Sequence, residues 1–270
     1  MSHLGLSDCW GKTSTAVDGL FTASGKGYME RDLGDGFSVM RVTSGSKLYK
    51  KTVDCIASGE CGSTTTAPDP LIDWVYTKRS EGICEPLVAD SSSHRREWFQ
   101  FFAAFLVDFG IKRGGTYALV NKASGDVVSA TVTAPPRTVH NVTHTCYQGD
   151  LRKAGMKMAI EVLTNPSMTA LGTWQHHTQG KLGLGNNFLE IVVFATAPEW
   201  QGRGCGSMLL RFLGLLADTD GVISLLETAG SRNTTFYSKK GNFEEYSRDS
   251  IKSFVHEGGG VAMLRHPTSK

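Results

Sequence analysis

A glycine-rich turn at residues 201–206 carries the residue types and spacing most able to do chemistry. It follows the apolar run 189–196 and leads into the apolar segment 208–213, a pattern that predicts a strand, a turn and a helix. Glycines leave backbone N–H groups bare and a helix N-terminus carries partial positive charge, so such a turn can bind a phosphate group. The residues of this candidate anion site are Gln201, Gly202, Arg203, Gly204, Cys205, Gly206 and Ser207.

Two common phosphate-binding motifs do not fit this turn. A P-loop needs a lysine after its glycines, whereas Gly206 is followed by Ser207. A dinucleotide-binding turn needs a third glycine and a place near the first strand of a parallel sheet. Here the third glycine is missing and the turn comes late in the chain, after predicted hairpins. A glycine turn that only reverses the chain stays open as an alternative.

A third motif fits. The pattern Gln201-x-x-Gly204-x-Gly206 after an apolar strand resembles the acyl-CoA pyrophosphate loop of the GNAT superfamily of acetyltransferases. Further segments follow in the family's order and spacing, and the block from 189 to about 265 resembles most closely the puromycin-acetyltransferase-like branch. Residues 37–133 match the family's earlier elements in type and order only. The matching segments are Pro198–Gly204, Leu226-Glu227-Thr228, Asn233–Tyr237 and Gly241-Asn242-Phe243.

The resemblance implies acetyl-CoA as co-substrate. The loop glycines would approach its pyrophosphate, and Arg203 would add charge from the side. Phe194, Ala195 and Thr196 match the strand positions beside which the pantetheine arm lies as an added strand, with a backbone N–H near Phe194 polarising the thioester carbonyl. Asn233 matches a residue that bonds pantetheine or water. Cys205, at the helix start, either has a thiol of lowered pKa or contributes only its backbone N–H.

Acetyl transfer also needs a base for the amine and an acid for the departing thiolate. Glu190 and Glu227 are the candidate bases, and strand alternation predicts Glu190 on the same face as Phe194. Alternatively, Glu190 faces solvent or pairs with an arginine, and Glu227 makes a structural hydrogen bond across splayed strands. Tyr237 matches the family's general acid, with core packing as its alternative role.

Elements that must position these residues can be predicted from periodicity. The resemblance implies an α/β fold (α+β, with a mixed sheet), the GNAT acyl-CoA N-acyltransferase fold with splayed central strands. We expect one domain at 36–270 after a loose N-terminal extension at 1–35. Residues 137–187 are the least clear. Strands are predicted at 37–42, 116–121, 126–133, 189–196, 222–227 and 260–265. Helices are predicted near 48–56 and at 70–76, 95–109, 151–163 and 233–240. A further helix is expected after Pro166, and another runs from the glycine turn to Ala217.

Composition narrows the class of protein. The 270 residues have 40% hydrophobic content and a net charge of +2, so no strong field favours nucleic acid or an anionic membrane. No apolar run reaches the roughly 20 residues of a membrane span. The six cysteines form no Cys-x-x-Cys pair, and no secretory signal is evident, which favours a reducing, cytoplasmic setting. The adjacent side chains of His176 and His177 would diverge on a helix, so no metal is expected.

These patterns together predict an N-acetyltransferase. It would transfer an acetyl group from acetyl-CoA to a primary amine by direct attack in a ternary complex, without metal. A small-molecule amine is the expected partner, and the chain is expected to be a monomer or a homodimer. Two alternatives stay open: a protein lysine or N-terminal acetyltransferase, and a catalytically silent acyl-CoA-binding module.

Overall fold

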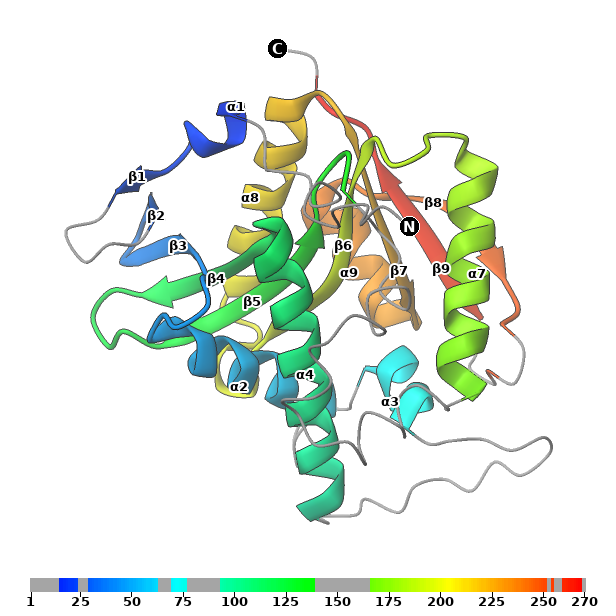
Figure 1. The fold of residues 1–270 in the computed structure, drawn as a ribbon, viewed down its shortest axis with the longest axis horizontal. Helices are drawn as coiled ribbons and strands as arrows, with labels where there is room; N and C mark the ends of the chain where they lie inside the picture. Colours follow the sequence, from blue (N-terminus) through cyan, green and yellow to red (C-terminus); the bar gives the residue numbers. More distant parts are fainter. Residues whose placement is uncertain are drawn as a thin grey trace, which may run out of the picture.

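The computed structural model describes residues 15–23, 29–62, 69–76, 93–138, 166–251, 254 and 259–268 (Figure 1). They form a nine-stranded mixed sheet of order β1-β2-β3-β4-β5-β6-β7-β9-β8. The strands are β1 (Thr22–Ala23), β2 (Met29–Gly34), β3 (Phe37–Arg41), β4 (Thr116–Asn121), β5 (Val127–Ala134), β6 (Phe188–Thr196), β7 (Ile223–Ala229), β8 (Glu244–Asp249) and β9 (Gly260–Arg265). The helices are α1 (Thr15–Asp18), α2 (Leu48–Cys61), α3 (Pro70–Tyr76), α4 (Ser93–Arg113), α7 (Pro166–Leu182), η3 (Pro198–Trp200), α8 (Cys205–Asp220) and α9 (Ser231–Gly241).

Helices cover both faces of this sheet because its strands alternate apolar side chains to either side. On β4, Ala118 and Val120 join one buried cluster, whereas Tyr117 and Leu119 join another. The first cluster packs the sheet against α2, α3, α4 and α7. The second packs it against α1 and α8, with Phe236 and Tyr237 of α9 at its margin. No described helix is long and apolar enough to cross a membrane.

The centre of the sheet opens between β6 and β7. These parallel strands pair only from Phe188 opposite Ile223 to Ile191 opposite Leu226. Beyond Ile191, β6 stays paired with β5, while β7 continues against β9 as far as Ala229. The predicted mixed sheet with splayed central strands is thus confirmed, and among the described residues one edge of β6 beyond Ile191 has no strand neighbour.

A β-bulge in β6 changes which side chains share a face. Val193 pairs with Val132, but Ile191 pairs with the next residue of β5, so Val192 is an extra residue. As a result Ile191 and Phe194 both belong to the α8 side of the sheet. Glu190 alternates with Ile191 and faces α7. The prediction that Glu190 and Phe194 share a face was therefore wrong, since strict alternation does not survive a bulge.

The N-terminal part is more ordered than predicted where it is described. Strand β2 pairs antiparallel with β3, Glu30 lying opposite Met40, so residues 29–34 belong to the sheet and not to a loose extension. Asp35 and Gly36, with φ of 50° and 79°, form the tight turn between them. The alternation of β2 is hard to detect because the strand is polar and partly exposed.

Most other elements lie where periodicity placed them. The hairpin of β4 and β5, the strand–turn–helix of β6 and α8, and the helix after Pro166 are confirmed. Helix α4 is longer than predicted, beginning at Ser93 and ending at Arg113. Strand β8 was missed because its six residues are mostly exposed and polar. The helix predicted at 151–163 lies outside the described residues.

Candidate active site

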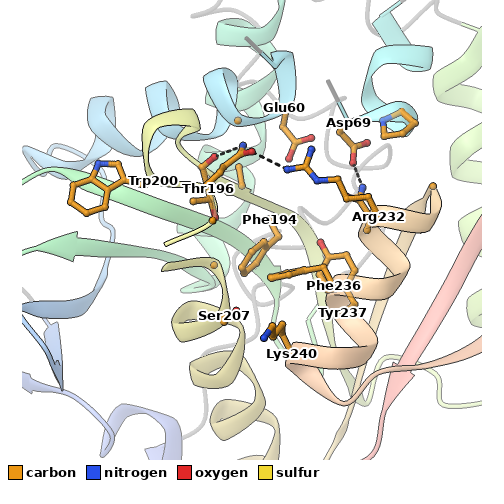
Figure 2. A pocket seen from close by; sticks show the side chains of 18 of the residues that line it. Glu60, Asp69, Phe194, Thr196, Trp200, Ser207, Arg232, Phe236, Tyr237 and Lys240 are labelled. Atoms are coloured by element: carbon orange, nitrogen blue, oxygen red, sulfur yellow. Dashed lines mark hydrogen bonds between the residues drawn. The ribbon is translucent and has the colours of Figure 1, made fainter. Parts of the chain in front are cut away.

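A cavity of about 560 Å³ occupies the opening between β6 and β7 (Figure 2). Its walls are the end of β6, the glycine turn with the start of α8, one face of α9, and the end of α2 with the start of α3 above them. This volume is in the range of small-molecule and cofactor sites. Most predicted site residues line it: Phe194, Ala195, Thr196, Gln201, Gly202, Gly204, Gly206, Ser207, Asn233 and Tyr237.

The glycine turn has the backbone geometry of an anion site. Gly202 and Gly204 have φ of 76° and 84°, conformations that L-residues rarely adopt. Gly204 is also the N-cap of α8, and within the described part of the chain no side chain caps this helix. The first N–H groups of α8 are therefore available to a ligand at the cavity wall. At Gly206 a Cβ atom would come within 2.9 Å of Thr196 Oγ1, so the helix start lies tight against the end of β6.

Two residues of the turn do not line the cavity. Arg203 is exposed, with its guanidinium carbon 5.3 Å from the ring centroid of Trp200. Cys205 is 1% exposed, and burial raises the pKa of its thiol despite the nearby charge of Arg203. A lowered thiol pKa at this helix start is therefore contradicted. What remains open for Cys205 is a contact through its backbone N–H.

The unpaired edge of β6 presents its backbone to the cavity. The Gln201 side chain donates to the Thr196 carbonyl at 3.1 Å, and Arg232 donates to Gln201 Oε1 at 3.0 Å (Figure 2). The next residue along, Ala197, instead donates its N–H towards β5, to the Val128 carbonyl at 3.1 Å. Backbone groups alternate in direction along a strand, so the N–H and C=O of Phe194 point into the opening as the Thr196 carbonyl does.

Tyr237 sits on the face of α9 that forms a cavity wall. Asn233 lies one turn before it, and Phe236 and Lys240 share the face. The Tyr237 ring packs edge-on against the Phe194 ring, with the two ring centroids 6.2 Å apart. Figure 2 shows the Tyr237 hydroxyl directed towards the side where α2 ends and α3 begins. Burial raises the pKa of Tyr237 well above its ordinary value, and nearby carboxylates raise it further, so the phenol keeps its proton.

Two carboxylates in this cavity were not predicted from the sequence. Glu60 lies in the last turn of α2 and Asp69 directly precedes α3, and both line the cavity (Figure 2). Asp69 Oδ2 accepts a hydrogen bond from Asn233 at 2.8 Å. The amide of Asn233, predicted to bond pantetheine or water, is thus held by a carboxylate. The one local signal was an aspartate directly before a helix-starting proline, which is typical of an N-cap and suggests no chemistry.

The two predicted bases lie elsewhere, on the α7 side of the sheet. Glu190 is 2% exposed, accepts a hydrogen bond from Gln179 at 3.1 Å, and does not line the cavity. Burial raises the pKa of Glu190 to about 8, against the effects of Gln179 and Arg113. Burial and the charge of Glu190 together hold the pKa of Glu227 well above its ordinary value. Catalysis by either carboxylate stays a prediction.

The described residues contain no group of three or more His, Cys, Asp or Glu side chains able to hold a metal ion. His176 and His177 are exposed on α7.

Comparisons with known proteins bear on the fold. No protein-family model and no curated protein matches the sequence. Among solved structures, the chain is similar to arylalkylamine N-acetyltransferase 2 from Aedes aegypti, at 13% identity and a TM-score of 0.55 over 87% of this chain and 100% of that one. It is also similar to an agmatine N-acetyltransferase mutant in its apo form, at 13% identity and a TM-score of 0.52 over 86% of this chain and 100% of that one. A histone acetyltransferase HPA2-related protein from Corynebacterium glutamicum is similar at 14% identity and a TM-score of 0.51 over 86% of this chain and 97% of that one. The chain therefore has the fold of GNAT-type N-acetyltransferases.

Proposed function

We propose that this chain transfers an acetyl group from acetyl-CoA to a primary amine by direct attack. The observation that carries the proposal is the cavity in the opening between β6 and β7, which combines three kinds of group. The glycine turn offers backbone N–H groups for a phosphate, the β6 edge offers unpaired peptide groups, and Tyr237 offers a proton.

Acetyl-CoA matches these groups in order. Its pyrophosphate would accept hydrogen bonds from the backbone N–H groups of Gly204 and Gly206 at the start of α8, with Arg203 adding positive charge from outside. Its amide-rich pantetheine arm would lie along the β6 edge as an additional strand. The thioester carbonyl would then reach the inward-pointing N–H of Phe194, which would stabilise negative charge on the oxygen during attack.

Catalysis needs a base and an acid beside that carbonyl. Tyr237, kept protonated in the cavity, is suited to protonate the departing thiolate. The amine must lose a proton, and carboxylates at Glu60 and Asp69 are within the cavity, whereas Glu190 and Glu227 are not. The anionic pair also favours an acceptor that arrives as an ammonium ion. Several structural neighbours are described as acting on amines, among them arylalkylamines and agmatine.

Other features of the proposal rest on the sequence. The Leu-Glu-Thr and Asn-x-x-x-Tyr segments support a place beside the puromycin-acetyltransferase-like branch. A cytoplasmic location, a single domain, and a monomer or homodimer stay predictions.

Thermal stabilisation by acetyl-CoA and by CoA is the first test. The melting temperature should rise with ligand at millimolar concentration, and a panel of small amines, polyamines, antibiotics and peptides should then be followed by CoA release. Turnover of small amines supports the proposal. Turnover of peptides alone would mean a protein acetyltransferase, and binding without turnover would mean a silent acyl-CoA module. No stabilisation by either nucleotide would refute the proposal.

A further inference from the structure

We infer that Glu60 takes the proton from the acceptor amine and that Asp69 is a fixed anion that positions the reacting groups around it. This inference rests on the proposed function. It assigns the base to residues other than the predicted Glu190 and Glu227.

The first argument is position. A Cβ at Gly59 would lie 2.9 Å from Ala195 Cβ and 3.1 Å from the Thr196 carbonyl oxygen, so the end of α2 lies directly against the end of β6. Glu60, the next residue, therefore lines the cavity beside the segment along which the thioester would lie. The main-chain N–H of Asp69 donates to the Glu60 carbonyl at 3.0 Å, which ties the two acidic residues together.

The second argument is that the two carboxylates have different partners. Asp69 Oδ1 accepts from the N–H groups of Leu71 and Ile72 at 2.9 and 3.1 Å, and its Oδ2 accepts from Asn233. Burial raises the pKa of Asp69, and these three donors act against it by stabilising the charged form and fixing the orientation of the carboxylate. The described residues supply no donor to the Glu60 carboxyl. Its oxygens are therefore able to accept a proton from a ligand in the cavity.

The third argument is electrostatic. Burial raises the pKa of Glu60 well above its ordinary value, and the negative charge of Asp69 raises it further. The groups packed around Glu60 on α4 and β6 are apolar: Phe99, Phe102, Ala103, Leu106 and Val193. Among the described residues, Glu60 also acts electrostatically on Cys55 of its own helix and on Tyr237 of α9, and Arg232 and Lys240 of α9 line the same cavity. A carboxylate of raised pKa is a stronger base than an ordinary glutamate.

The protons balance in this scheme. Glu60 takes one proton from the ammonium group, and the resulting amine forms the C–N bond at the thioester carbonyl carbon. The C–S bond breaks, and the thiolate leaves with the electron pair and takes the phenolic proton of Tyr237. The second nitrogen proton returns to Tyr237, and Glu60 releases its proton to solvent. The products are the amide, the CoA thiol and one proton.

The test compares Glu60→Gln, Asp69→Asn and a matched control, Glu199→Gln, which changes a glutamate outside the cavity lining. Each is assayed with acetyl-CoA and an amine that the wild type acetylates, over about pH 6–9.5, with acetyl-CoA affinity and melting temperature measured alongside. Glu60→Gln should lower kcat about 10²–10⁴-fold and abolish the rise of kcat/KM with pH. Its acetyl-CoA affinity should stay unchanged, and its melting temperature should not fall because a neutral amide replaces a buried acid.

Asp69→Asn tests the positioning role through the pH profile. Loss of the neighbouring negative charge lowers the pKa of Glu60, so the rise of kcat/KM should remain but move to lower pH. The melting temperature should fall because an amide has one acceptor oxygen, so it cannot accept both from the N–H groups of α3 and from Asn233.

Three results would overturn the inference. If Glu60→Gln acetylates the amine as fast as the wild type, Glu60 is not the base, and the proposed acetyl transfer itself still stands. Loss of the pH-dependent rise in Asp69→Asn but not in Glu60→Gln makes Asp69 the base. A wild type that binds acetyl-CoA yet acetylates no amine refutes this inference and the proposed function together.

Discussion

Substituting Gly204 by alanine separates the folding cost of the glycine turn from its part in binding. Gly204 has φ of 84° and ψ of −6°, a left-handed conformation, and no atom of the described residues beyond its chain neighbours lies within 4 Å of where a Cβ would stand. The folding cost is therefore a backbone cost alone, about 1–2 kcal/mol. At about 2–4 °C per kcal/mol, the melting temperature should fall by about 2–8 °C.

The binding cost has a different source. The new methyl group would stand at the cavity wall, where the pyrophosphate is proposed to approach the N–H groups of α8. A hydrogen bond to a charged group is worth about 1.5–3 kcal/mol. Losing one should raise the Kd for CoA about 10–150-fold, measured by isothermal titration calorimetry.

Gly125→Ala is the matched control. Gly125 has φ of 70°, also has open space where a Cβ would stand, and lies in the β4–β5 hairpin away from the cavity. Gly125→Ala should lower the melting temperature by a similar amount and leave CoA affinity unchanged. If Gly204→Ala instead binds CoA as tightly as Gly125→Ala does, the glycine turn is not the pyrophosphate site. If Gly204→Ala melts like the wild type, the left-handed backbone argument fails.

Three further predictions concern acid stability, catalysis and packing. Burial raises the pKa of Asp218, but its hydrogen bonds from Arg265, at 2.9 and 2.8 Å, help to hold that pKa below its ordinary value. The stability that this pair contributes is present above the ordinary aspartate pKa and is lost as pH falls. In urea unfolding, Asp218→Asn should therefore lower the free energy of unfolding by about 1–3 kcal/mol at pH 7, and the difference from the wild type should shrink in acid. An equal difference at every pH would contradict this prediction. Tyr237→Phe should lower kcat with little change in the KM for acetyl-CoA, and an unchanged kcat would remove Tyr237 as the acid. Gly110→Ala places a Cβ against Thr116 Oγ1 and should cost about 1–3 kcal/mol in urea unfolding, whereas wild-type stability would show that α4 can shift freely on the sheet.

The local parts of the fold and site could be predicted because their signals are local. A continuous apolar run, a glycine turn and an apolar helix identify β6 and α8 wherever they occur in a sequence. The face of Glu190 could not be predicted, because the bulge at Val192 depends on how β6 pairs with β5. A strand's own letters do not carry that register.

The meeting of α2, α3 and α9 was equally beyond the sequence. Asp69 and Asn233 are 164 residues apart and are joined by one hydrogen bond that no spacing rule indicates. Each residue has an ordinary local role at its helix, so neither attracts attention in isolation. Only the folded chain brings Glu60, Asp69 and Tyr237 to one cavity.

The open edge of β6 has a consequence for the life of the protein in the cell. An arm that fills this edge would act as a missing strand, so the sheet would be complete only while the donor is bound. A ligand present at about 100 times its Kd adds about 2.7 kcal/mol to the free energy of unfolding. The abundance of the folded protein would then rise and fall with the supply of acyl donor, making its turnover sensitive to metabolic state without any separate sensor.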